Sequence, residues 1–187
     1  MNDLISLQLD DAQEQMQKAL NHTENELTKI RAGKAMPSML DGLNVDYYGS
    51  ATPISQVANV NTPDPRTLVI QPWEKNMLQV IEKAIIDSSL GLNPQNDGSI
   101  IRLVIPILTE ERRRELVKKV KDEGERGRVA VRNIRKDAND QLKKLKNEGL
   151  SEDEIKVGEA EVQKLTDSFI AKVERLIESK EKDIMTV

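Results

Sequence analysis

Residues 109–149 read TEERRRELVKKVKDEGERGRVAVRNIRKDANDQLKKLKNEG, and the predicted architecture follows from this segment. Apolar or small residues recur along it every three or four positions, which is the spacing of one face of an α-helix. The positions on this face are Val117, Val120, Gly124, Gly127, Val131, Ile134, Ala138, Leu142 and Leu145. We predict a single helix of about 40 residues, about 60 Å long at a rise of about 1.5 Å per residue. A helix with one apolar stripe needs partners that bury the stripe, so the chain must supply further long helices.

Two other stretches repeat this helical spacing. Residues 2–31 place one set of small and apolar side chains on a face: Ile5, Leu9, Ala12, Met16, Ala19, Thr23, Leu27 and Ile30. The residues after Ser151 place another: Ile155, Gly158, Val162, Leu165, Phe169, Val173 and Leu176. Ser151 and Glu154 have the spacing of a capping box, which marks where this last helix begins. Three striped helices predict a long antiparallel three-helix bundle made of residues 1–31 and 106–187.

Residues 32–105 have a different composition. Six of the seven prolines lie in residues 37–94, and short β-type runs alternate there with turn residues. The runs are residues 43–48, 54–60, 67–71 and 100–105, and one amphipathic helix fits near residues 75–88. We therefore predict an α+β protein in which a small β/α/β domain is inserted between the first and second helices of the bundle.

Two segments, near residues 31–34 and 105–108, connect the expected domains. A double connection can serve as a hinge or as a fixed corner. The residues alone leave both interpretations open.

Positive charge is concentrated in one part of an acidic chain. The formal net charge is −4, yet residues 110–148 carry fourteen basic and nine acidic side chains. Five of the basic residues share one helical face: Arg114, Lys121, Arg128, Arg132 and Arg135. Forked guanidinium donors suit phosphate oxygens, which favours a ridge that contacts phosphates. The alternative is a solvated face whose arginines form salt bridges with the acidic third helix, and both interpretations stand at this point.

Residues that the sequence lacks exclude several classes of protein. There is no cysteine, hence no disulfide or thiolate metal site, and His22 is the only histidine. No nucleotide-binding glycine motif and no apolar run of about 20 residues occurs. The acidic N-terminus does not fit a signal peptide. We expect no catalytic residue, no metal, no cofactor and no membrane attachment, and a cytoplasmic location.

A different functional class also fits long amphipathic helices with few aromatic residues. It is a non-catalytic scaffold or chaperone that binds proteins along the seams of its bundle. Such a protein would depend neither on RNA nor on particular arginines.

Five motifs, in this order and spacing, resemble the ribosome recycling factor family. They are residues 30–35 (IRAGKA), 46–49 (DYYG), 84–94 (AI followed by SLGLNP), 108–113 (LTEERR) and 128–138 (RVAVRNIRKDA). The resemblance covers nearly the whole chain. It implies a three-helix bundle with an inserted β/α/β domain and an L-shaped molecule.

The resemblance also implies a function that needs no catalysis by the chain itself. A factor of this family binds the large subunit of the post-termination ribosome, on its 23S ribosomal RNA. With elongation factor G and GTP it splits the subunits, which releases mRNA and tRNA for a new round of translation. We therefore expect these partners, no membrane and a monomer.

Residue roles follow from the same resemblance. The expected RNA contacts are Arg31, Arg128, Arg132 and Arg135, with Lys121 and Lys136 on the same basic stretch, and Arg132 is the foremost of them. In the family the inserted domain rotates and is pushed by the GTPase, which favours the hinge interpretation. The expected hinge residues are Gly33, Lys34, Ile105, Pro106 and Ile107. Lys34 stands where the family usually has arginine, so its contact with a phosphate would lack the bidentate fork.

Overall fold

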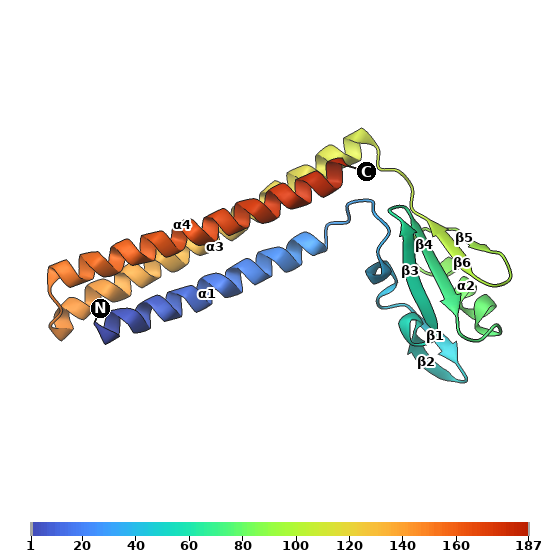
Figure 1. Cartoon of the computed structure of the whole chain (residues 1–187), viewed down its shortest axis with the longest axis horizontal. Coiled ribbons are helices and arrows are strands. Elements are labelled where there is room, and N and C mark those ends of the chain that lie inside the picture. The colour runs from blue at the N-terminus through green and yellow to red at the C-terminus, as the bar shows by residue number, and fades with distance from the viewer. Residues whose placement is uncertain (1, 187) are drawn as a thin grey trace. The chain divides into compact units, whose positions relative to one another are not determined.

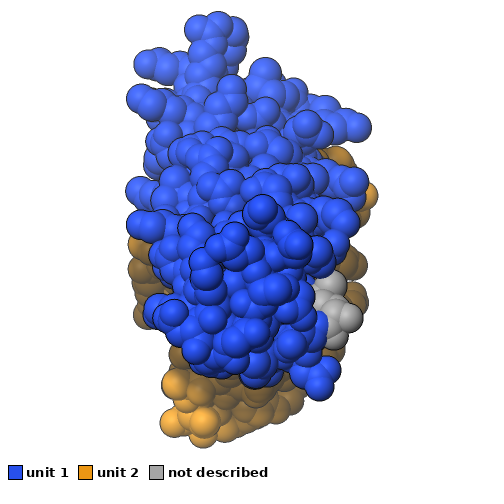
Figure 2. Space-filling model, turned by 90° about the vertical axis from the view of Figure 1, so that its left-hand side faces the viewer, with its two compact units in different colours: residues 1–32, 110–186 blue, residues 33–109, 187 orange. Residues whose placement is uncertain are grey.

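The computed structural model describes residues 2–186 and divides the chain into two compact units. Unit 1 contains the described residues up to Ala32 together with residues 110–186, and unit 2 contains residues 33–109. Figure 2 colours the two units separately. Unit 2 therefore begins one residue later than the predicted boundary before residue 32, and it extends past residue 105 to residue 109.

Unit 1 is built from three long helices, labelled in Figure 1: α1 (Asp3–Thr28), α3 (Glu110–Lys144) and α4 (Glu152–Met185). Their directions follow from three close approaches at glycines. Gly127 of α3 lies against Thr23, and Gly124 lies against Ile177. Gly158 of α4 lies against both Ile5 and Leu142. Thus α3 runs antiparallel to α1 and to α4, and the predicted antiparallel three-helix bundle is confirmed.

The apolar stripes meet in an aliphatic core. Side chains that are at most 1% exposed include Ile5, Met16, Val120, Val131, Leu142, Val162 and Val173. Some predicted positions lie at the edge of the seam instead. Leu165 and Leu176 are only half-buried, while their neighbours Thr166 and Ile177 are buried. An apolar stripe drifts around a straight helix because 3.6 residues per turn do not divide the repeat evenly.

The turn between α3 and α4 corrects one predicted boundary. The α-helix does not continue to Gly149: it ends at Lys144 and tightens into a 3-10 turn, Leu145–Glu148. Gly149 then adopts φ +98°, and the N–H of Leu150 donates to the carbonyl of Leu145. This is a Schellman-type ending, which satisfies carbonyls that the helix leaves free. The predicted capping box is confirmed, with Ser151 as N-cap and Glu154 bonded back to it.

Unit 2 consists of two antiparallel sheets and one helix (Figure 1). A hairpin is formed by β1 (Asn44–Tyr47) and β2 (Ser50–Pro53). The larger sheet has the order β3-β4-β6-β5, from β3 (Ala58–Asp64), β4 (Thr67–Pro72), β5 (Pro94–Asn96) and β6 (Ile101–Val104). The helix α2 (Met77–Ile86) and the 3-10 turns Pro37–Leu40 and Ile54–Gln56 complete it.

Two strands of unit 2 were not predicted from the sequence. Both β2 (SATP) and β5 (PQN) are short, contain proline and have mostly exposed side chains. Their strand conformation comes from pairing with β1 and β6, which is tertiary rather than local information. The predicted run 54–60 begins instead as a 3-10 turn, and its strand starts at Ala58. Within this unit, Leu68, Ile70 and Leu103 of the sheet share a buried core with Ile81 and Ile85 of α2.

Hydrogen bonds to the turn Pro65–Arg66 hold both connecting segments to unit 2 and so explain its boundaries. The N–H of Ile105 donates to the carbonyl of Arg66 at 2.7 Å, and Arg66 Nη2 donates to the carbonyl of Ile105 at 3.3 Å. Ile105 is 5% exposed and belongs to the core of unit 2. The N–H of Ala35 donates to the carbonyl of Pro65 at 2.8 Å. Both connecting segments are therefore tied to one turn of unit 2.

Candidate functional site

The basic residues of α3 lie in two different environments. Arg128 marks the first, at the seam between α3 and α4. Its side chain is 20% exposed, its Nε donates to Glu125 at 2.8 Å, and its Nη1 donates to Glu174 of α4. Burial alone lowers the pKa of Arg128, but the hydrogen bonds to Glu174 and Glu125 outweigh it and raise the pKa. Arg128 is thus held within the bundle by two carboxylates.

Arg135 and Lys121 share this seam. Arg135 Nη1 donates to Gln163 of α4 at 3.4 Å. Lys121 Nζ lies 3.9 Å from a carboxylate oxygen of Glu181, also on α4. The interpretation of salt bridges with the third helix therefore describes Arg128 and Lys121, and Arg135 makes an uncharged contact with the same helix.

Arg132 and Lys136 mark the second environment, on the outer side of α3. The Arg132 side chain is 48% exposed, and its ion-pair partner is Glu125, at 3.3 Å from Nη1. Lys136 is exposed and forms no ion pair within residues 2–186. Lys121, although it faces Glu181, is itself 64% exposed, so Arg132, Lys136 and Lys121 can all meet an anionic ligand from solvent.

Arg31 lies apart from these residues. It is exposed and follows the end of α1. Thr23 of α1 lies against Gly127 of the antiparallel helix α3. Arg31 is eight residues beyond this contact toward one end of the bundle, and Arg132 is five residues beyond it toward the other end. The two arginines are therefore separated by roughly 20 Å along the axis, at 1.5 Å per residue. The structure does not gather the six predicted contacts into one cluster.

The predicted hinge residues also differ among themselves. A Cβ on Gly33 would lie 2.7 Å from Leu108 Cγ, so only glycine lets these two connecting segments approach so closely. Pro106 and Ile107 are exposed and lie outside any helix or strand, whereas Ile105 is fixed in unit 2. Lys34 is half-buried.

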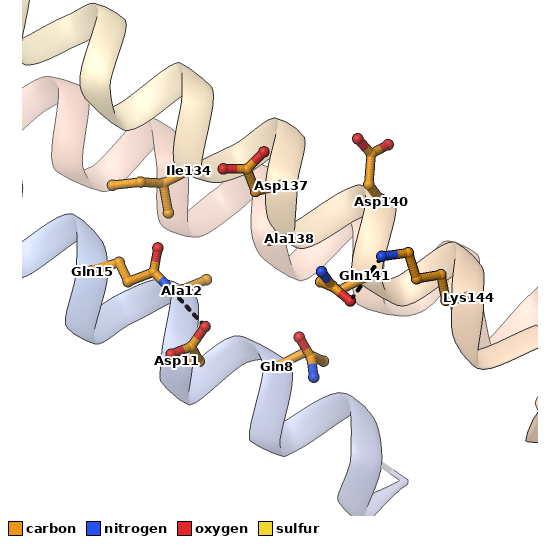
Figure 3. Close-up of a pocket in the computed structure, with 10 residues that line it drawn as sticks. All are labelled: Gln8, Asp11, Ala12, Gln15, Ile134, Asp137, Ala138, Asp140, Gln141 and Lys144. Carbon is orange, nitrogen blue, oxygen red and sulfur yellow. Dashed lines mark hydrogen bonds between the residues drawn. The ribbon is translucent and has the colours of Figure 1, made fainter.

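A groove of about 390 Å³ between α1 and α3 offers a different kind of surface. Its carboxylates are Asp11, Asp137 and Asp140. In Figure 3, Gln15 donates to Asp11 at 2.7 Å and Asp140 points away from α1.

No group of histidine and carboxylate side chains in residues 2–186 could hold a metal ion. Every helix within residues 2–186 is too short or too polar to cross a membrane.

Two polar features were not found from the sequence. One is Glu125, the acid to which both Arg128 and Arg132 donate. The other lies in unit 2, where the hydroxyls of Tyr47 and Tyr48 each donate to Glu74 at 2.8 Å. These hydrogen bonds lower the pKa of Glu74. The only signal for Glu125 was its i, i+3 and i, i+7 spacing from the arginines, and Glu74 lies too far along the chain for any pattern to pair it.

Comparison with known proteins connects this architecture to one family. The sequence model for the family "Ribosome recycling factor" matches residues 23–185. The ribosome-recycling factor of Cytophaga hutchinsonii is 59% identical over 183 residues, covering 98% of each chain.

Two solved structures agree with the fold. The solution structure of a ribosome recycling factor has a TM-score of 0.75 at 40% identity and covers 100% of both chains. The T. thermophilus ribosome recycling factor, bound with the E. coli elongation factor G to the E. coli post-termination complex, has a TM-score of 0.63. It is 51% identical and covers 97% of this chain and 98% of its own. Together with the bundle and its inserted sheet domain, these similarities mean that the chain belongs to the ribosome recycling factor family.

Proposed function

We propose that the chain binds the large subunit of the post-termination ribosome and, with elongation factor G and GTP, splits the subunits to release mRNA and tRNA. The observation that carries this proposal is the 51% identity, over nearly the whole chain, to the T. thermophilus factor bound with elongation factor G to a post-termination complex. The chain acts in the cytoplasm as a monomer. It needs no cofactor and catalyses no reaction, since elongation factor G hydrolyses the GTP.

The outer side of α3 supplies the contact with 23S ribosomal RNA. Arg132 and Lys136 are exposed there, and a guanidinium group offers forked donors to phosphate oxygens. Arg31, which follows the C-terminal end of α1, adds a separate contact. Arg128 and Arg135 contribute positive potential beside the RNA while they contact α4, and the more exposed Lys121 adds to this potential.

Unit 2 receives the push from elongation factor G. The two connections act as the hinge, with movement confined to Gly33 and Lys34 on one side and to Pro106 and Ile107 on the other. This assignment is supported by Ile105, which is bonded to Arg66 and buried in the core of unit 2, so the connection leaves that core only after Ile105.

Breakdown of polysomes tests the proposal. Puromycin-treated polysomes are incubated with cognate elongation factor G and GTP, with and without the chain, and separated on a sucrose gradient. We expect conversion to monosomes or subunits only when all three components are present. Persistent polysomes in the complete reaction would contradict the function and favour a protein-binding scaffold.

A further inference from the structure

A chain of four alternating charges runs from α4 to the outer side of α3. Glu174 of α4 accepts from Arg128 Nη1, and Arg128 Nε donates to Glu125 Oε2 at 2.8 Å. Glu125 Oε1 then accepts from Arg132 Nη1 at 3.3 Å. One carboxylate thus connects an arginine within the bundle to the arginine that we assign to RNA.

The inner end of this chain is anchored. Arg128 is 20% exposed and has partners on two helices, so its side chain has little freedom. Its bond to Glu125 Oε2 restricts the carboxylate, although Glu125 is 52% exposed. The hydrogen bond from Arg128 also lowers the pKa of Glu125, and the acid is ionised at neutral pH.

The outer end leaves most of Arg132 available. A guanidinium has five N–H donors, and the contact with Glu125 uses one nitrogen, Nη1. The remaining donors are free to meet a phosphate. A long side chain that is already restricted loses less entropy on binding, which is worth about threefold to tenfold in affinity.

We propose that Glu125 is a positioning residue that orients Arg132 toward a phosphate of the large-subunit RNA. The inference rests on the proposed function and adds to it an acidic residue in the middle of a basic surface. Apart from its pair with Arg128, an acid there would repel RNA. The opposing interpretation is that Glu125 competes with the phosphate for Arg132.

A double-mutant cycle distinguishes these two roles, because they predict opposite signs of coupling. The affinity of the full-length protein for isolated cognate large subunits is measured for the wild type, E125Q, R132A and the double variant. If Glu125 positions Arg132, R132A weakens binding by about threefold to tenfold less in the E125Q background than in the wild type. If Glu125 competes, R132A weakens binding more in that background. Equal or larger losses in the E125Q background would overturn the proposal.

The cycle is compared with a matched control, E14Q. Glu14 pairs with Lys18 at 2.7 Å on the exposed surface of α1, so E14Q makes the same charge change at a site without an arginine. We expect no coupling between E14Q and R132A. Thermal unfolding of each variant establishes that the bundle is intact. A wild-type protein that does not bind large subunits would refute the proposed function itself, whereas binding that depends on Arg132 without coupling to Glu125 would refute only this inference.

Discussion

Tyr48 has a positive φ of +50°, a backbone conformation that residues other than glycine rarely adopt. It precedes Gly49, which has φ +84°, in the two-residue connection between β1 and β2. Hairpin turns with two positive φ values favour Asn-Gly, so a tyrosine here costs conformational energy. The compensation is visible in its contacts. The Tyr48 hydroxyl donates to Glu74 and accepts from Asn76, and its ring lies 4.7 Å from that of Tyr47.

The contact between Tyr48 and Glu74 predicts a pH dependence of stability. Hydrogen bonds from Tyr47 and Tyr48 hold the pKa of Glu74 below its ordinary value of 4.5. The stabilising contribution is therefore complete above pH 4.5 and is lost as the pH falls through the lowered pKa of the folded state. We expect Tyr48→Phe to lower the free energy of unfolding at pH 7, and the difference from wild type to shrink below pH 4.5. Urea denaturation across this range measures it. A difference that stays constant down to pH 3 would argue against the role of Glu74.

Arg132 and Arg128 should respond differently to truncation. We expect Arg132→Ala to weaken binding to the large subunit and to reduce the slope of log affinity against log salt by about one, with little change in thermal stability. Arg128→Ala leaves Glu125 and Glu174 without their common partner and should cost about 1 kcal/mol of stability. Binding assays at several salt concentrations, together with thermal unfolding, separate the two effects. A large loss of stability in Arg132→Ala would show that this residue is structural.

At the scale of the elements, glycines set how closely the long helices approach. A Cβ on Gly127 would lie 2.6 Å from Thr23 Oγ1, and a Cβ on Gly124 would lie 2.6 Å from Ile177 Cγ1. Both distances are too short for packed atoms, so α3 meets α1 and α4 at positions where it lacks a side chain. Each glycine weakens the helix by about 1 kcal/mol relative to alanine. The bundle retains them because close packing on two sides requires them.

Gly124→Ala tests this balance. The gain in helix propensity is about 1 kcal/mol, and overpacking of a well-packed site costs about 1–3 kcal/mol. We expect a net destabilisation of up to about 2 kcal/mol, measured by chemical denaturation. Adding Ile177→Val to Gly124→Ala should recover part of the loss, because it removes the Cδ1 methyl group that the new side chain meets. Stabilisation by Gly124→Ala alone would mean that the helices shift without cost.

At the scale of the whole molecule, the two units have separate cores and are joined by two segments. The core of unit 2 includes Ile105 and Ala35, and both are hydrogen-bonded to the turn Pro65–Arg66. The parts of the connections left outside this network are short. A change of stiffness there should alter the coupling between the units without altering either core.

Ile107→Pro tests the proposed hinge. Ile107 is 60% exposed, follows Pro106 and lies outside any helix or strand, so a second proline stiffens this connection without interrupting an element. We expect Ile107→Pro to bind large subunits as the wild type does and to support slower polysome breakdown. Ile107→Ala, which removes the same side chain without restricting the backbone, should match the wild type in both assays. Polysome breakdown by Ile107→Pro at the wild-type rate would contradict the hinge proposal.

Three features could be predicted from the amino-acid sequence: the three long helices, the inserted domain between the first two, and the capping box at Ser151. These features depend on local periodicity, caps and prolines, which the chain order displays directly. The remaining features depend on contacts between segments that are distant in the chain. The strands β2 and β5 exist through pairing, and Ile105 joined unit 2 through its bonds to Arg66. Tertiary structure also separated Arg128, which packs against Glu174, from Arg132, which remains exposed four residues later. Helical spacing places both arginines on one face, but only the position of α4 determines which of them is held in the seam.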